Sequence, residues 1–195
     1  MNILNSIDNF ITNILNALGI FGPLLGCIFI IIESILPILP LSVFVTLNFY
    51  AFGNILGFII SYIFTIIGCM ISYIIVRKGF KNKFDKFMNK KERKRLKKYI
   101  VSFNKIKLEH LVILIAIPFT PAFLVNIAAS LSDISKKKFW VSLLIGKIFM
   151  VYFWGYVGVT LIDSFKNPIY ILRIIILVLI AYLIGKIVNK KVGVE

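Results

Sequence analysis

The chain has 195 residues, of which 59% are hydrophobic and only 16% are charged, and its formal net charge is +15. A soluble domain carries about 25% charged residues, so this chain has too little polar surface to cover a globule in water. Composition therefore argues against a soluble enzyme, a disordered chain and a nucleic-acid-binding domain. It predicts an all-helical integral membrane protein with one membrane domain, residues 1–195.

Residues 1–20 carry apolar side chains at helical spacing, with Asn, Ser, Asp and Thr between them. This pattern predicts an amphipathic helix lying in the outer membrane interface. The first basic residue of the chain is Arg77. A cleavable signal peptide needs a basic start, so none is expected.

The apolar segment 21–52 is too long for one straight membrane span, and Pro37 and Pro40 interrupt it. Proline removes a backbone donor and breaks a helix. The segment is therefore predicted to form a re-entrant hairpin, which enters the membrane, turns at the two prolines and leaves on the same side. The next segment, 55–76, is long and apolar enough to be the first full transmembrane helix.

Segment 77–107 holds fourteen of the 23 lysines and arginines. By the positive-inside rule it is predicted to be a cytoplasmic loop. Phe80, Phe84 and Phe87 recur at helical spacing among the lysines. Part of the loop is therefore expected to be a basic amphipathic helix resting on anionic lipid headgroups. Docking of a nucleic acid or an acidic protein is the less favoured alternative.

A second basic cluster, at residues 136–138, follows one further apolar segment, 108–135. A single crossing by that segment would place the cluster outside, against the positive-inside rule. Pro118 and Pro121 divide the segment into arms of ten to twelve residues, about 15–18 Å long, whereas the hydrocarbon core is about 30 Å thick. A second re-entrant hairpin is therefore predicted.

Segments 139–162 and 169–188 are predicted to be the remaining transmembrane helices. The two hairpins share their proline spacing, P-I-L-P and P-F-T-P, and each precedes a spanning helix that contains a glycine, Gly68 or Gly146. The first span ends on the cytoplasmic side and the second begins there. The predicted fold is therefore an inverted repeat of hairpin plus transmembrane helix, with an N-terminal amphipathic helix and a C-terminal transmembrane helix. Inverted repeats with broken helices are typical of transporters.

Glu33 is the strongest single candidate for a functional residue, because it is the only acidic residue between Asp8 and Asp85. A carboxylate at the bilayer centre costs about 2.5–3.5 kcal/mol on insertion scales, a cost that points to a role. The favoured interpretation is a group that binds a proton or faces a substrate. The structural alternative is a buried acid that hydrogen-bonds backbone groups freed by Pro37.

Two further polar residues lie in apolar surroundings. Broken helices leave N–H groups unpaired, and a helix N-terminus attracts an anion, so two facing half-helices suit a phosphate headgroup. Lys147 either directs its ammonium group at that phosphate or extends to the cytoplasmic interface. Asn126 either binds substrate or satisfies backbone groups, and the second is favoured.

The remaining candidates are structural. Gly53, Gly57, Gly68 and Gly146 are expected to let helices pack closely. The two cysteines lack the spacing of a metal site and one histidine cannot build a metal centre, so no metal or cofactor is expected. No catalytic motif is present, and an enzyme is not expected.

Several of these residues form motifs that resemble the DedA family, whose domain is also called VTT or SNARE-associated Golgi protein. Glu33, Pro37 and Pro40, the G-x-x-x-G that begins at Gly53 and the Y-x-x-x-R-x-G that begins at Tyr73 resemble its first half. The stretch I-P-F-T-P-A-F-L-V-N-I-A-A-S-L-S resembles its second-half motif.

The resemblance covers residues 22–158 and implies a polytopic protein with two oppositely oriented re-entrant hairpins. It also implies movement of lipids between leaflets. Bacterial members are associated with recycling of undecaprenyl phosphate or translocation of phospholipids, coupled to the proton gradient. The family's hairpin glutamate corresponds to Glu33. Two of its arginines are Ile115 and Pro121 here, so Lys147 or backbone N–H groups would replace them.

The sequence therefore predicts a flippase or scramblase of the bacterial plasma membrane. Its expected partners are anionic membrane lipids and protons, a second copy of the chain is left open, and no nucleic acid is expected. A membrane-structural or assembly factor that docks a partner through the basic loop is one alternative. A small-ion transporter is the other.

Overall fold

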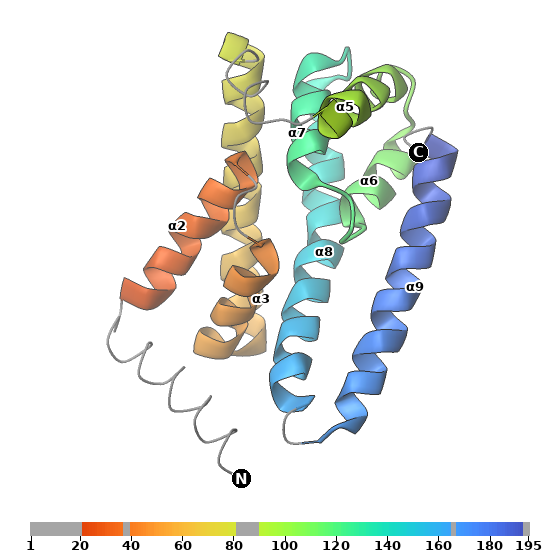
Figure 1. Ribbon diagram of the computed structural model, residues 1–195. Helices are drawn as coiled ribbons and strands as arrows, with labels where there is room; N and C mark the ends of the chain where they lie inside the picture. Colours follow the sequence, from red (N-terminus) through yellow and green to blue (C-terminus); the bar gives the residue numbers. More distant parts are fainter. Residues whose placement is uncertain (1–20, 37–39, 81–89, 165–166, 193–195) are drawn as a thin grey trace.

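The computed structural model describes residues 21–36, 40–80, 90–164 and 167–192. All regular structure in this part of the chain is helical, which confirms the predicted all-α class (Figure 1). The amphipathic helix expected at residues 1–20 lies outside the described residues. The helices are α2 (Phe21–Ile35), α3 (Leu41–Ile75), the π-helical turn η1 (Val76–Phe80), α5 (Lys90–Phe103), α6 (Leu108–Ala116), α7 (Ala122–Leu131), α8 (Lys136–Ser164) and α9 (Ile169–Val192).

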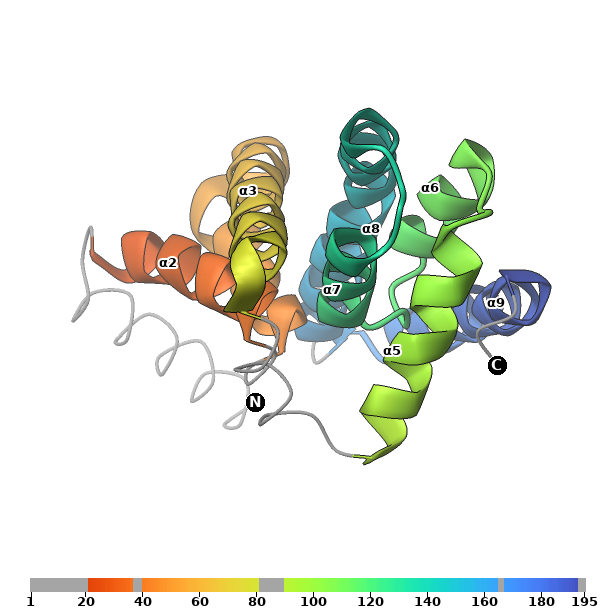
Figure 2. The same cartoon turned by 90° about the horizontal axis from the view of Figure 1, so that it is seen from above.

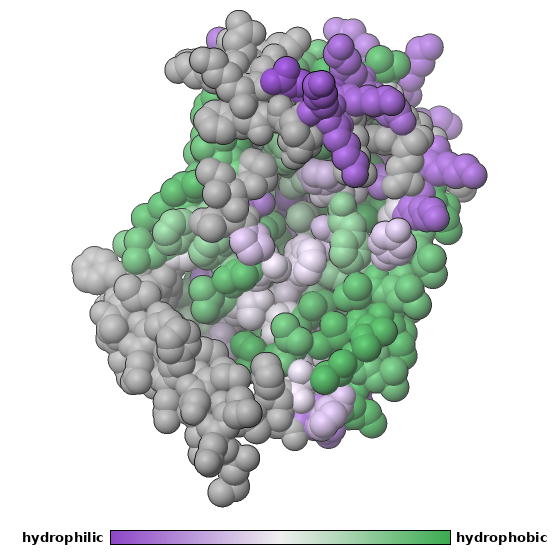
Figure 3. All heavy atoms as spheres, viewed as in Figure 1, coloured by the Kyte–Doolittle hydropathy of each residue, from purple (hydrophilic) through white to green (hydrophobic). Residues whose placement is uncertain are grey.

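Within the described ranges, three helical segments are long and apolar enough to cross a membrane: Leu41–Lys78, Lys136–Ser164 and Ile169–Lys190. Apolar side chains cover much of the visible flank, and hydrophilic side chains gather at the end of the molecule where α5 lies (Figure 3). Most large apolar side chains of α9 are exposed, as expected for a helix that faces lipid. These features are those of a multi-pass membrane protein.

Helix α3 is folded back on itself at Gly53, where φ is 76° and ψ is 174°. Residues with a side chain rarely adopt this conformation, so glycine permits the corner. The parts before and after the corner run in opposite directions (Figure 1). The Asn48 side-chain amide donates a hydrogen bond to the Ser61 hydroxyl at 3.1 Å and joins the two parts. A Cβ atom on Gly57 would lie 2.6 Å from the Cα atom of Phe49, so glycine is also needed for their close approach.

Each predicted hairpin corresponds to two helices with a break between them. The first helix ends at Ile35 and the next begins after Pro40, which has an extended backbone conformation. The second break runs from Ile117 to Pro121 and contains a turn in which the Thr120 N–H donates to the Ile117 carbonyl at 3.2 Å. The chain reverses direction at both breaks, and the two reversals have opposite senses in Figure 1. Pro37 lies outside the described residues.

Helix α8 is the centre of the bundle. It packs against α3 on one side and α9 on another, and α6 also contacts it (Figure 2). A Cβ atom on Gly146 would lie 2.8 Å from the Ile115 side chain, so this glycine brings α8 against α6. Gly68 has the same role between α3 and α2, since its Cβ would lie 2.7 Å from the Cβ atom of Ser34.

Gly53 differs from the packing glycines among which the sequence placed it. A Cβ atom there would meet nothing within 4 Å, and the residue is needed for its positive φ. Its role is therefore to turn the backbone. A glycine with this role can be told from a packing glycine only by its φ angle, which the sequence does not give.

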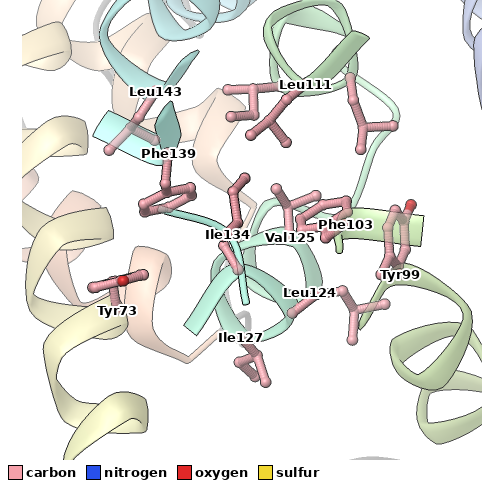
Figure 4. Packing of buried hydrophobic residues seen from close by; sticks show 14 of the residues in the cluster. Tyr73, Tyr99, Phe103, Leu111, Leu124, Val125, Ile127, Ile134, Phe139 and Leu143 are labelled. Carbon is pink, nitrogen blue, oxygen red and sulfur yellow. The ribbon is translucent and has the colours of Figure 1, made fainter. Parts of the chain in front are cut away.

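The main apolar core joins α3, α5, α6, α7 and α8 (Figure 4). Tyr73 of α3 stacks on Phe139 of α8 with ring centroids 4.9 Å apart, and Ser130 of α7 donates to the Tyr73 carbonyl at 3.1 Å. Helix α5 contributes Tyr99 and Phe103 to this core. The apolar side of this basic helix thus faces α7. The basic amphipathic helix expected against lipid rested on Phe80, Phe84 and Phe87, and residues 81–89 lie outside the described residues.

Candidate functional site

The breaks in the two hairpins meet at one cavity of about 440 Å³, which we call the tip cavity. It is lined by Glu33 of α2, by residues 40–42 at the start of α3 and by residues 118–123 around the start of α7. Met150 and Trp154 of α8 complete its wall. Segments distant in sequence thus converge on one space, and it contains the described residues of both proline pairs.

Two helices begin at the tip cavity without a side-chain cap. Helix α3 begins after Pro40 (φ −75°, ψ 117°) and α7 begins after Pro121 (φ −65°, ψ 102°). The first N–H groups of a helix have no partner within the helix, and they carry the positive end of its dipole. Because both helix starts line one cavity, its electrostatic character favours an anion.

The tip cavity also brings a carboxylate and an ammonium group near each other. Glu33 lines it directly, and Lys147 of α8 interacts with Glu33 electrostatically. Lys147 is only 2% exposed, and its ammonium group donates to the Met150 sulfur at 3.1 Å. It therefore does not extend to the cytoplasmic interface, which was one of its two sequence interpretations.

A second, much smaller cavity of about 10 Å³ adjoins the first, and we call it the donor pocket. Thr120 and Ala122 line both cavities, and Asn126 and Lys147 line the donor pocket. Among the described residues, neither the Thr120 hydroxyl nor the Asn126 side-chain amide nitrogen has a hydrogen-bond partner. The sequence favoured a role for Asn126 in hydrogen-bonding backbone groups, but in the structure its amide nitrogen makes no such bond.

Thr120 is the site residue that sequence reasoning missed. In the sequence it stands out only as part of the P-F-T-P motif. Its hydroxyl becomes notable because the turn places it, 96% buried, at the wall shared by the two cavities. The sequence could have pointed to Thr120 only if the turn between Pro118 and Pro121 had been expected to line the site.

A third cavity forms an apolar groove of about 310 Å³ between the start of α3 and the end of α8. Ser42 and Trp154 line both this groove and the tip cavity, so the two spaces adjoin. Val43, Leu47 and Leu161 contribute exposed apolar side chains to the groove. The tip cavity, which contains Glu33 and Thr120, is thus continuous with an apolar surface.

Metal binding has no support in the described part of the chain, where no three His, Cys, Asp or Glu side chains gather in a group that could hold an ion. The buried cysteines, Cys27 and Cys69, are free thiols. Arg77, at the end of the first span, is exposed and donates to the Tyr73 hydroxyl at 2.6 Å, away from the tip cavity.

Comparison with known proteins identifies the family. Residues 39–160 match the model of the VTT domain. The match contains residues 40–42, helices α6 and α7 and all but the last four residues of α8, and it begins after Glu33. The chain is 28% identical over 185 residues to the uncharacterized membrane protein YhjE of Bacillus subtilis (strain 168), which covers 95% of this chain and 88% of that protein. No solved structure is significantly similar to it. The matched domain spans most of the chain, and this multi-pass membrane protein belongs to the VTT domain (DedA) family.

Proposed function

We propose that this protein is a lipid transporter, and not an enzyme, that moves a phosphate-bearing lipid between the leaflets of the bacterial plasma membrane. Undecaprenyl phosphate or a phospholipid is the proposed substrate class. The observation that carries the proposal is the tip cavity, which combines two uncapped helix starts with Glu33 and, next to it, the buried Lys147. A phosphate group matches the positive ends of two helices.

The lengths of α6 and α7 support a location of the tip cavity near the middle of the membrane. Helices α6 and α7 have 9 and 10 residues. At 1.5 Å per residue each is about 15 Å long, roughly half the thickness of the hydrocarbon core. Arms of this length suit a re-entrant hairpin with its turn near the midplane. The first hairpin runs in the opposite direction, so it would enter from the other face of the membrane and bring its turn to the same depth.

The apolar groove favours a lipid over a soluble phosphate compound as the substrate. The groove adjoins the tip cavity at Ser42 and Trp154 and is lined mainly by apolar side chains. A lipid could therefore keep its headgroup in the tip cavity while its chains remain in the groove and the surrounding bilayer. This division avoids transferring hydrocarbon through a polar site.

Glu33 is the proposed proton-binding group. It is the carboxylate that lines the tip cavity in the described structure, and Lys147 interacts with it electrostatically. A proton taken up by Glu33 from outside would cancel its charge while the anionic headgroup occupies the cavity. Release of that proton as the headgroup changes side would couple lipid movement to the proton gradient.

Transport by purified protein in liposomes tests this proposal, with several lipid headgroups and with and without a pH gradient. Glu33→Ala and Glu33→Gln are expected to reduce lipid translocation to the rate of protein-free liposomes without loss of folded protein. Glu109→Gln, an exposed glutamate in the first turn of α6, is the matched control and should keep the wild-type rate. Wild-type transport by Glu33→Gln would exclude the proton role.

The basic face of α5 favours a second candidate, an assembly factor that docks an acidic partner. Lys90, Lys91, Lys94 and Lys97 are exposed, while the apolar side of α5 is held against α7. Replacing these four lysines by glutamine separates the two functions. Cellular function lost with intact topology and liposome transport would favour docking, whereas transport lost in liposomes would not. Ion flux with unchanged lipid distribution would instead indicate a small-ion transporter.

A further inference from the structure

We infer that Lys147, Asn126 and Thr120 form a buried subsite for one oxygen atom of a phosphate group. The inference deepens the proposed function and rests on it for the identity of the lipid. It assigns the deepest contact of the headgroup to the donor pocket, behind the tip cavity, and to side chains from α7, α8 and the turn before α7.

The first argument is burial. Lys147, Asn126 and Thr120 are 2%, 1% and 4% exposed, and all three line the same pocket. A buried polar group without a partner costs about 1–3 kcal/mol, and a buried charge costs more. The Asn126 amide nitrogen and the Thr120 hydroxyl are both unpaired among the described residues. Two unpaired donors beside a buried ammonium group are explained by a ligand that supplies the missing acceptor.

The second argument is the chemistry of the Lys147 contact. Its ammonium group donates to the thioether of Met150, which is a weak hydrogen-bond acceptor. Met150 itself lines the tip cavity. An anionic oxygen that reaches Lys147 from this cavity would replace a weak acceptor with a strong, charge-assisted one. A ligand that enters the cavity could thus replace the Met150 sulfur as the hydrogen-bond acceptor of Lys147.

The third argument is size. The donor pocket holds about 10 Å³, close to the minimum for one water molecule, so it admits a single oxygen atom and no larger group. Because Thr120 and Ala122 line both spaces, the phosphorus atom and the rest of the headgroup would stay in the tip cavity. Ammonium, amide and hydroxyl donors around a space of this size suit an oxyanion and oppose a cation.

A lipid phosphate and free orthophosphate share this chemistry, so the test measures both. Purified protein in detergent is titrated with a phosphatidic acid, with orthophosphate and with diacylglycerol, which lacks the phosphate. Thr120→Val removes the hydroxyl and keeps the shape of the side chain. It is expected to weaken phosphatidic acid binding about tenfold, the scale of one hydrogen bond to a charged group.

Thr65→Val is the matched control. Thr65 is fully buried and its hydroxyl is also unpaired, but it lines none of the three cavities described here. Its replacement should change binding less than about twofold, within the usual effect of a distant site. Lys147→Met is expected to weaken phosphatidic acid binding by more than Thr120→Val does. Removing one partner of a buried charge pair can cost about 3–5 kcal/mol, so binding is compared only for Lys147→Met protein that is shown to be folded by circular dichroism and size-exclusion chromatography in detergent.

The outcomes separate the subsite from the transport function. Weaker binding of phosphatidic acid in Thr120→Val, with diacylglycerol binding unchanged, supports the subsite. Weaker orthophosphate binding, with no lipid translocation by the wild-type protein, keeps the subsite and contradicts the lipid transporter. Unchanged binding of both phosphate ligands in folded Thr120→Val and Lys147→Met overturns the subsite, and the donor pocket then holds only a water molecule.

Discussion

Glu33 and Lys147 are the two charged residues that the site depends on, and they illustrate why single residues matter in an apolar environment. Glu33 lies on α2 and Lys147 on α8, and the two interact electrostatically across the bundle. Each charge would be costly alone in a membrane interior. Together, next to two helix starts, they form a site whose net charge can change with one proton on Glu33. This property supports the proposed transport of an anionic lipid.

Gly53 provides the residue-scale prediction. Its φ of 76° and ψ of 174° place it in a region where a side chain costs about 1–3 kcal/mol, although a Cβ there would have open space. Gly53→Ala is therefore expected to lower the free energy of unfolding by that amount through backbone strain alone. Unfolding of purified protein by denaturant in detergent measures it.

Asn54→Ala, at the exposed neighbouring position, is the control for the corner and should leave stability within about 0.5 kcal/mol. Equal stability of Gly53→Ala and the wild-type protein would show that the corner adopts another conformation.

Pairs of helices position the site at the next scale. Helix α2 carries Glu33, and its contact with α3 is set by Gly68, which lies against Ser34, the next residue after Glu33. Only the small side chain of Ser34 lies between the two helices at this point, so the backbone of α2 approaches α3 closely. The position of Glu33 relative to the tip cavity therefore depends on a residue that does not line the cavity.

Gly68→Val is expected to separate α2 from α3, because even its Cβ atom would lie 2.7 Å from the Cβ atom of Ser34. Overpacking of this kind costs about 1–3 kcal/mol. We expect lipid translocation in liposomes to fall roughly tenfold or more, since enzymes lose about 100-fold when a reacting group is misplaced by about 1 Å.

Ile67→Val tests the specificity of this effect, because Ile67 is the exposed neighbour of Gly68 on the same helix. It should keep wild-type transport and stability within about 0.5 kcal/mol. A Gly68→Val protein that folds and transports normally would mean that the α2–α3 contact does not position Glu33.

The whole molecule is organised around α8, whose two ends are expected to lie on opposite sides of the membrane. Lys137 lies near its start and Asp163 near its end, and both are exposed. The distance from Lys137 to Asp163 along a helix, 26 steps of 1.5 Å, is about 39 Å, more than the hydrocarbon thickness of about 30 Å. With a re-entrant second hairpin, Lys137 is cytoplasmic and Asp163 is external.

Labelling of intact cells with a membrane-impermeant maleimide tests this arrangement. With Cys27 and Cys69 replaced by alanine, Asp163→Cys should react in intact cells and Lys137→Cys only after the membrane is permeabilised. The two variants control for each other, since both sites are exposed at helix ends. External labelling of Lys137→Cys would mean that segment 108–135 crosses the membrane, and the re-entrant arrangement would be wrong.

Several features of the protein could be predicted from its sequence because they depend on local chemistry. The surplus of apolar residues requires a membrane, and the four prolines prevent continuous helices in two of the apolar segments. Helices α6 and α7, with a break from Ile117 to Pro121, follow directly from Pro118 and Pro121. The motifs around these prolines were also sufficient to identify the family.

Other features depend on which helices pack together, and sequence spacing does not determine that. Thr120 carries one of many hydroxyl groups in the sequence. It lies near Asn126 and Lys147 only because α7 and α8 line the same pocket. Gly53 looks like any packing glycine until its φ is known. The sequence alone determined where the proline pairs interrupt the helices and that the chain lies in a membrane, since both are properties of short segments. Only the tertiary structure decided which polar groups meet, because their proximity results from contacts between helices far apart in the chain.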